Sequence, residues 1–384
     1  MTQLRDVSTV PYVVRRIGPI MSPEPGNPLE VEGVLNPGTA WGSDGQLYLY
    51  PRMVAQGNVS RIGRARVVVE DGVPVAVERL GVVLAPDRRW ERSRDTAGVE
   101  DPRITFVEPL GLHVMTYVAY GPLGPRPAIA VSRDTVEWRR LGPIRFAYQP
   151  ELDTDLNLFP NKDITFFPEA VPGPDGRPAL ALLHRPMWDL EWLRPGAGAP
   201  APAGIVDTRP SIWIGYVDLE QASRDITMLT SVHGSELVAV PEMPFEESKI
   251  GAGPAPLRVP EGWLVLHHGV TGANGKGFAL AHGARYTAGA ILLDPADPRH
   301  VIARTPQPLL VPETAEELQG TLGNVVFPTA VEKIGDRTFV FYGMADSQIG
   351  VAELERRSTT VSKGAGHETY QVADRDDAEH RRRR

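Results

Sequence analysis

The chain has 384 residues, a formal net charge of −8 at pH 7, 42% hydrophobic and 23% charged residues, and no cysteine. This composition is typical of a globular protein, and the negative charge argues against general binding to nucleic acid or anionic membranes. The lack of cysteine excludes disulfides and thiolate catalysis. No segment has the length and apolar character of a membrane span or a secretory signal, so we expect a cytoplasmic protein that binds neither nucleic acid nor membrane.

The 38 glycines and 37 prolines favour many short strands joined by turns over long helices. One short motif recurs five times: a β-branched or small residue, followed by Gly or Ala, opens an apolar strand. The copies are Ile62-Gly63, Ile129-Ala130, Ile214-Gly215, Ala288-Gly289 and Ile349-Gly350. A recurrence of this kind predicts stacked or radial sheet units.

Each copy is preceded by an apolar stretch that predicts another strand, at residues 47–50, 112–117, 179–183, 263–266 and 338–341. Before each of these strands lies a polar, turn-like motif, beginning at Asn36, Glu100, Asn161, Lys249 and Asn324. We therefore predict an all-β fold, a five-bladed β-propeller forming a single domain over residues 1–357. A pair of β-sandwiches or a long β-barrel is the alternative. Only residues 314–319 suggest a short helix.

Two segments lie outside this pattern. Residues 187–211 are rich in Pro, Gly and Ala and are predicted to be a loop insertion at the surface, with a lid over the site as the less favoured interpretation. Residues 358–384 are polar and end in four arginines, a composition that predicts a disordered tail.

Basic residues end several of the predicted strands. In a propeller the innermost strands line a central channel, so such residues should meet there. Cations gathered in an acidic protein indicate a bound anion, and phosphate is the obvious candidate. The basic set is Arg52, Arg185, Lys249 and His268.

Aromatic residues at similar places offer either stacking surfaces for a sugar ring or ordinary packing. They are Tyr117, Tyr120, Trp263 and Tyr342. No metal site is predicted, because His184, His267 and His268 lack the spacing and the partner carboxylates of a zinc site.

Two adjacent carboxylates, Glu100 and Asp101, precede Pro102 and Arg103. One interpretation is an Asx-type turn before proline with a paired arginine, a common arrangement. The other is a general acid at Asp101, whose pKa Glu100 would raise by like-charge repulsion and Arg103 would lower. The residues alone leave both interpretations open.

Taken together, these motifs resemble glycoside hydrolase family 130, the β-mannoside phosphorylases and related β-mannosidases. The similar segments occur in the family's order and span roughly residues 30 to 355. They are residues 98–103, 161–169, 183–186, 249–254, 262–270, 292–298, 324–328 and 342–346.

The resemblance implies a five-bladed propeller with one catalytic acid, Asp101, which in this family protonates the glycosidic oxygen through the 3-hydroxyl of the bound mannose. Inorganic phosphate attacks C1 from the opposite face, which gives inversion and α-mannose 1-phosphate. Phosphate is already a nucleophile, so no base carboxylate is required as in an inverting hydrolase. The resemblance thus implies phosphate as co-substrate with no cofactor, a β-mannoside oligosaccharide as partner, and a homo-oligomer as one assembly.

By the same resemblance, phosphate is expected at Arg185, Lys249 and His268. The expected substrate-binding residues are Asn36, Arg52, Arg103, Asn161, Asp163, Tyr342 and Asp346. The chain departs from some members at Pro160, where they place a further basic residue.

Three alternatives stay open. The first is a phosphate-independent β-mannosidase on the same fold, and the second is a mannoside-binding propeller without activity. The third is a different glycosidase on a propeller scaffold, which would need two or three separated carboxylates in its channel.

Overall fold

A computed structural model describes residues 9–93, 96–190, 196, 201–272 and 283–357. The all-β prediction is confirmed, since these residues form many strands and two short α-helices, α1 (Leu219–Arg224) and α2 (Ala315–Leu318). The short helix expected at residues 314–319 is α2. None of the helices in these ranges is long and apolar enough to cross a membrane. The predicted tail at 358–384 and part of the 187–211 insertion lie outside the described residues.

The largest sheet has eight strands in the order β2-β3-β4-β6-β7-β8-β9, with β5 paired to β4. Its two halves meet through a short parallel contact between β4 and β6, where Val59 lies opposite Ala97 and Ser60 opposite Gly98. The other pairings in this sheet are antiparallel. The strands are β2 (Gly33–Trp41), β3 (Leu47–Ala55), β4 (Val59–Glu70), β5 (Val73–Leu84), β6 (Ala97–Val107), β7 (Leu112–Gly121), β8 (Gly124–Ser132) and β9 (Arg139–Pro143).

Two further sheets follow along the chain. The six-stranded sheet contains β10 (Arg145–Phe146), β11 (Asn161–Phe166), β12 (Val171–Pro172), β13 (Pro178–Pro186), β14 (Ile212–Asp218) and β15 (Ser231–Ala239). The five-stranded sheet contains β16 (Lys249–Ala252), β17 (Leu257–Val259), β18 (Gly262–Thr271), β19 (Arg285–Leu293) and β20 (Val301–Arg304).

The fourth sheet joins the two ends of the described chain. It contains β1 (Tyr12–Met21), β21 (Val326–Ile334), β22 (Arg337–Met344) and β23 (Gln348–Arg356). Strand β1 pairs antiparallel with β23, with Tyr12 opposite Arg356. The first strand therefore completes a sheet formed by the last three.

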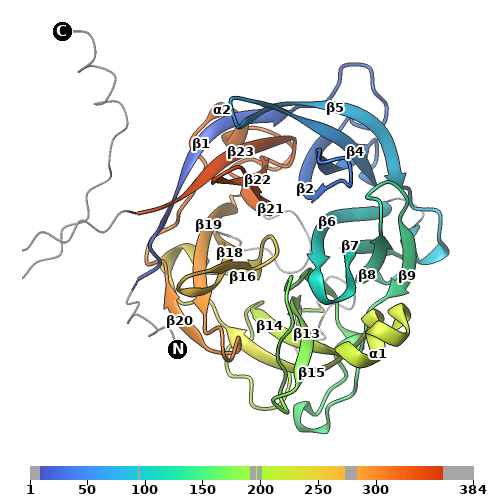
Figure 1. The fold of residues 1–384 in the computed structure, drawn as a ribbon, viewed down its shortest axis with the longest axis vertical. Coiled ribbons are helices and arrows are strands. Elements are labelled where there is room, and N and C mark those ends of the chain that lie inside the picture. The colour runs from blue at the N-terminus through green and yellow to red at the C-terminus, as the bar shows by residue number, and fades with distance from the viewer. Residues whose placement is uncertain (1–8, 94–95, 191–195, 197–200, 273–282, 358–384) are drawn as a thin grey trace, which may run out of the picture.

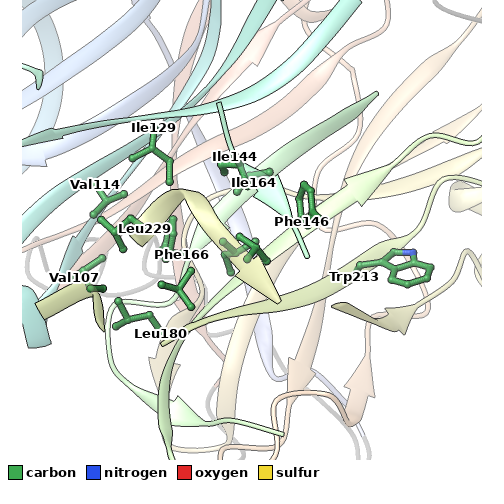
Figure 2. Close-up of a cluster of buried hydrophobic side chains, with 14 of the residues drawn as sticks. Val107, Val114, Ile129, Ile144, Phe146, Ile164, Phe166, Leu180, Trp213 and Leu229 are labelled. Atoms are coloured by element: carbon green, nitrogen blue, oxygen red, sulfur yellow. The ribbon is translucent and has the colours of Figure 1, made fainter. Parts of the chain in front are cut away.

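The sheets are arranged around a central space, with β2, β6, β16 and β21 nearest to it (Figure 1). Strand β2 contacts β6 and β21, and β11 contacts β6 and β16. This radial arrangement agrees with a propeller, while the number of blades stays a prediction. Apolar side chains fill the space between neighbouring sheets: in Figure 2, Val114 and Ile129 of the eight-stranded sheet share one core with Phe166, Leu180 and Trp213 of the six-stranded sheet.

Three of the five polar motifs predicted as turns lie inside strands, at β-bulges. Asn36, Asp101 and Asp163 have left-handed backbones, with φ of 43°, 48° and 56°. The pairing register breaks at each of these places, in β2, β6 and β11. Asn and Asp adopt this conformation more readily than other side-chain-bearing residues, and a bulge redirects the side chain. The bulges therefore place three polar side chains on the inner strands at one end of the central space.

The repeated small residue has a packing role. Gly289 lies opposite His267 and Gly350 lies opposite Tyr342 on the neighbouring strand. A Cβ atom at Gly289 would lie 2.7 Å from Cε1 of His267, and one at Gly350 would lie 2.6 Å from Cζ of Tyr342. The small residue thus leaves room for a large side chain on the strand before it.

Those large side chains belong to a repeated buried cluster. The hydroxyl of Tyr342 donates a hydrogen bond to Oε1 of Glu317 (3.0 Å), and Nε of Arg16 donates to the same oxygen (2.9 Å). Glu317 is fully buried on α2. Tyr342 lies on β22, and Arg16 lies on β1, the outermost strand of the same sheet. The same arrangement recurs as Glu91 with Tyr117 and Arg140, and as Glu246 with His267 and Arg304. Each cluster ties a helical turn to the second and the outermost strand of a sheet.

Candidate active site

A cavity of about 660 Å³ lies where the inner strands converge, a size typical of small-molecule sites. Eight of the eleven predicted site residues line it. They are Asn36, Arg52, Asp101, Asp163, Arg185, Lys249, His268 and Asp346. Predicted residues from three of the sheets and from the loop after β22 thus meet in one place.

The two oxygens of Asp101 have different surroundings. Oδ1 accepts hydrogen bonds from Nδ2 of Asn36 (2.9 Å) and from Nη1 of Arg52 (3.1 Å). Oδ2 lies 3.8 Å from Nζ of Lys162, which is too far for a hydrogen bond. None of the described residues donates a hydrogen bond to Oδ2, so this oxygen is the one available to a substrate.

Two cations hold the neighbouring carboxylates Glu100 and Asp101. Arg52 contacts Oε1 of Glu100 (2.8 Å) as well as Oδ1 of Asp101. Lys162 lies 3.6 Å from Oε2 of Glu100. Burial raises the pKa of Asp101, but Arg52 first and Lys162 second lower it further, to about 2. Arg103, the neighbour considered in the sequence, has a smaller effect.

Asp346 has the opposite tendency. Its backbone is also left-handed, with φ of 49°, and its side chain lines the cavity. Burial, together with the charges of Asp101 and Glu100, raises the pKa of Asp346 to about 6 despite the nearby Arg52. Asp101 is therefore ionised at neutral pH, whereas Asp346 loses its proton only as the pH approaches neutrality.

A second buried carboxylate organises the basic side of the cavity. Oδ1 of Asp163 accepts a hydrogen bond from Nη2 of Arg103 (3.0 Å), and Oδ2 accepts one from Nε of Arg185 (2.5 Å). Nε2 of His268 lies 3.7 Å from Oδ2. Burial raises the pKa of Asp163, but Arg185 and Arg103 outweigh it and hold the pKa well below its usual range.

Several buried polar atoms on this side have no hydrogen-bond partner among the described residues. Nη1 of Arg185 and both ring nitrogens of His268 are buried and have no hydrogen-bond partner within the described ranges. Burial holds the pKa of His268 well below its usual value, so the ring is neutral and carries one N–H. Lys249 adds its ammonium group, which donates to the hydroxyl of Tyr286 (3.0 Å). Buried polar groups normally have partners, so these groups indicate a site for a bound anion.

Two of the three remaining predicted residues, Arg103 and Asn161, do not line the cavity but contact residues that do. Arg103 donates to the carbonyl oxygen of Gly253 (2.7 Å) while it holds Asp163. Oδ1 of Asn161 accepts from the backbone N–H of Arg185 (3.1 Å), and its Nδ2 contacts Nδ1 of His184 (3.0 Å). Both residues are buried and do not line the cavity.

Tyr342 lies away from the cavity, in contrast to its predicted role. It is fully buried and its hydroxyl is used by Glu317. Tyr117 and Trp263, considered as stacking surfaces, are also buried in hydrophobic cores. Of the four aromatic candidates, only Tyr120 lines the cavity.

Sequence reasoning did not single out Lys162 and Tyr286 as site residues, although both line the cavity. Lys162 lies between two predicted residues, but the direction of its side chain depends on the bulge in β11. Tyr286, near the start of β19, belongs to no motif, and its contact with Lys249 becomes visible only when β16 and β19 are brought together.

Comparison with known proteins places this arrangement among β-mannoside-processing enzymes. The family model described as beta-1,4-mannooligosaccharide phosphorylase matches residues 4–173 and 226–360. A 1,2-beta-oligomannan phosphorylase from Thermoanaerobacter sp. (strain X514) is 29% identical over 88% of this chain and 95% of its own length. A beta-1,2-mannobiose phosphorylase from the same organism is 30% identical over 78% of each chain.

A solved structure has a similar fold. It is the beta-1,2-mannobiose phosphorylase from Listeria innocua in complex with beta-1,2-mannobiose, with a TM-score of 0.65 and 22% identity. The similarity covers 90% of this chain and 96% of the other. At this identity the likeness concerns the fold.

Proposed function

The chain belongs to glycoside hydrolase family 130, and we propose that it is an inverting phosphorylase of β-mannosides. The observation that carries the proposal is the pairing, in one cavity, of a carboxyl group that has an open oxygen with a set of cationic and N–H donors, of which Nη1 of Arg185 and the ring of His268 have no hydrogen-bond partner among the described residues. Asp101 provides the carboxyl group, and Arg185, Lys249 and His268 provide the donors.

In the proposed reaction the mannosyl unit lies against Asn36, Arg52 and Asp346. Asp101 is ionised in the free protein and so takes up a proton before this step. It then donates that proton through the sugar's 3-hydroxyl to the glycosidic oxygen, and the bond from C1 to that oxygen breaks. Phosphate, held by the donors on the other side, forms the new bond to C1 from the opposite face. The products are α-mannose 1-phosphate and a sugar shortened by one mannosyl unit.

The cationic side chains favour phosphate over water as the nucleophile. Asp163, the carboxylate in contact with them, is engaged by Arg103 and Arg185, and such pairing opposes a role as general base. A β-mannosidase needs a base carboxylate to activate water, and Glu32 and Asp189 also line the cavity. Some family members have a basic residue at the position of Pro160, and its absence here removes one positive charge that could hold phosphate. Hydrolysis is therefore the alternative.

A phosphate-dependence assay tests the proposal. The protein is incubated with β-1,2-mannobiose, β-1,4-mannobiose and mannosylglucose, each with and without phosphate. We expect α-mannose 1-phosphate, formed only when phosphate is present, and β-1,2-mannobiose is the first choice because of the named relatives. Release of mannose at the same rate without phosphate would instead establish a β-mannosidase. Binding of mannosides without turnover of any of them would establish a binding protein.

We propose that the fold is a five-bladed propeller over residues 1–357. The eight-stranded sheet divides at its two parallel residue pairs into two antiparallel runs, β2 to β5 and β6 to β9. With the other three sheets these make five radial units, each beginning on an inner strand.

A further inference from the structure

We propose that Lys162 is a positioning residue for the reaction: its ammonium group bridges Glu100 and Asp101 and keeps Oδ2 of Asp101 directed at the substrate. The proposal rests on the proposed function, in which Asp101 is the acid. Lys162 itself is assigned no contact with the reacting atoms.

The bridging geometry is symmetrical. Arg52 contacts one oxygen of each carboxylate, Oε1 of Glu100 and Oδ1 of Asp101, at 2.8 and 3.1 Å. Lys162 faces the other oxygen of each, Oε2 and Oδ2, at 3.6 and 3.8 Å. Without these two cations the adjacent carboxylates would repel each other inside a mostly buried wall.

The two bridges differ in tightness. Arg52 is fixed further by hydrogen bonds to Ser60 and Asn58, at 2.8 and 3.0 Å. Lys162 makes no hydrogen bond through its ammonium group to any described residue, and its side chain is 19% exposed in the cavity. An ammonium group on a flexible stem can hold a carboxylate in place and still leave room for a sugar hydroxyl at the same oxygen.

The backbone of Lys162 is held firmly on both sides. Asn161 is tied to the backbone N–H of Arg185, and Asp163 carries Arg103 and Arg185. The bulge in β11 falls at this point, where the register breaks between Lys162 and Thr165. The position of the ammonium group is therefore set by the same segment that organises the phosphate donors, which couples the two sides of the cavity.

Replacement of Lys162 by Met tests the role through the pH profile of kcat. The charged groups around Asp101 come from several elements: Arg52, Glu100, Arg103, Lys162 and Asp346. Loss of one cation favours the protonated acid, so the alkaline limb of kcat at saturating mannoside and phosphate should move up by about one pH unit. The maximal kcat should fall, while KM for phosphate should stay unchanged.

Two comparisons make the test specific. Lys162→Arg restores the charge and should return the alkaline limb towards that of the wild type. Lys333→Met, which removes an exposed lysine on β21 away from the cavity, should leave the profile unchanged. If Lys162→Met does not fold, as judged by its melting temperature, Lys162→Gln serves for the same measurement.

The outcomes separate this inference from the proposed function. An unchanged alkaline limb in the Lys162 variants, with Asp101→Asn inactive, overturns the inference alone. A rise in KM for phosphate with an unchanged limb also overturns it, because Lys162 would then belong to the phosphate site. Full turnover by Asp101→Asn overturns the proposed function itself.

Discussion

Asp163 holds two arginines at once: Nε of Arg185 donates to its Oδ2 at 2.5 Å, and Nη2 of Arg103 donates to its Oδ1 at 3.0 Å. All three side chains are buried. With Nε of Arg185 engaged, its Nη1 is left without a partner among the described residues. A buried carboxylate thus fixes the orientation of a guanidinium group whose Nη1 is left for the proposed phosphate.

Replacement of Asp163 by Asn should therefore weaken phosphate binding more than mannoside binding. An amide cannot neutralise two guanidinium groups, so Arg185 would lose its fixed orientation. We expect KM for phosphate to rise at least about tenfold, the equivalent of about 1.4 kcal/mol. The free energy of unfolding should fall by about 3 kcal/mol, as is usual when one partner of a buried ion pair is removed.

Steady-state kinetics with varied phosphate, and urea unfolding, measure the two effects. Asp336→Asn, at an exposed position, is the matched control and should change neither. An Asp163→Asn variant with the phosphate KM of the wild type would show that the orientation of Arg185 does not depend on Asp163.

Asp101→Asn should remove turnover and keep mannoside binding. The amide matches the carboxylate in shape and can still accept a hydrogen bond from Asn36, but it has no proton to donate to the sugar. We expect kcat to fall at least about 100-fold. Calorimetric titration with β-mannobiose should still detect binding, and equal turnover by variant and wild type would contradict the assignment of the acid.

Most of the strands could be predicted from the sequence, because apolar runs bounded by turn residues have few other interpretations. The repeated Gly or Ala marked the third strand of each unit, and its packing reason emerged only when Gly350 was seen against Tyr342. The polar motifs were predicted as turns because Asn and Asp with left-handed backbones serve turns and bulges equally well. Only strand pairing distinguishes the two.

The site could be predicted in part for a similar reason. Asp101, Arg185, Lys249 and His268 belong to motifs that stand out in the sequence. Lys162 did not stand out, because its role depends on distances to Glu100 and Asp101 across two strands. Tyr342 directly follows a predicted strand, as several cavity-lining residues do, and its partner Glu317 lies 25 residues away on α2.

The raised pKa of Asp346 predicts a pH dependence of stability. Its pKa of about 6 in the folded protein lies above the usual value of 3.8, so the folded state binds this proton more tightly than the unfolded state. The resulting contribution is fully present below about pH 4 and is lost as the pH rises through 6. In the Asp346→Asn variant the side chain cannot ionise, so this loss of stability does not occur.

Between pH 4 and pH 7 the wild type should therefore lose about 2 kcal/mol of unfolding free energy relative to Asp346→Asn. Urea unfolding of both proteins across this range measures the difference, with Asp336→Asn as the control. A constant difference across the range would show that Asp346 has an ordinary pKa in the folded protein.

Tyr342→Phe should reduce stability and leave catalysis unchanged. The hydroxyl of Tyr342 bonds only to Glu317 among the described residues, in a cluster closed by Arg16, and it does not reach the cavity. Loss of a hydrogen bond to a charged, buried group should cost about 2 kcal/mol of unfolding free energy. Removal of Arg140 from the equivalent cluster around Glu91 should likewise lower the melting temperature without changing KM, because that cluster also ties strands together away from the cavity. A tenfold rise in KM for mannoside in Tyr342→Phe would instead show that the hydroxyl turns towards the substrate, and would restore the role that its place at a strand end first suggested.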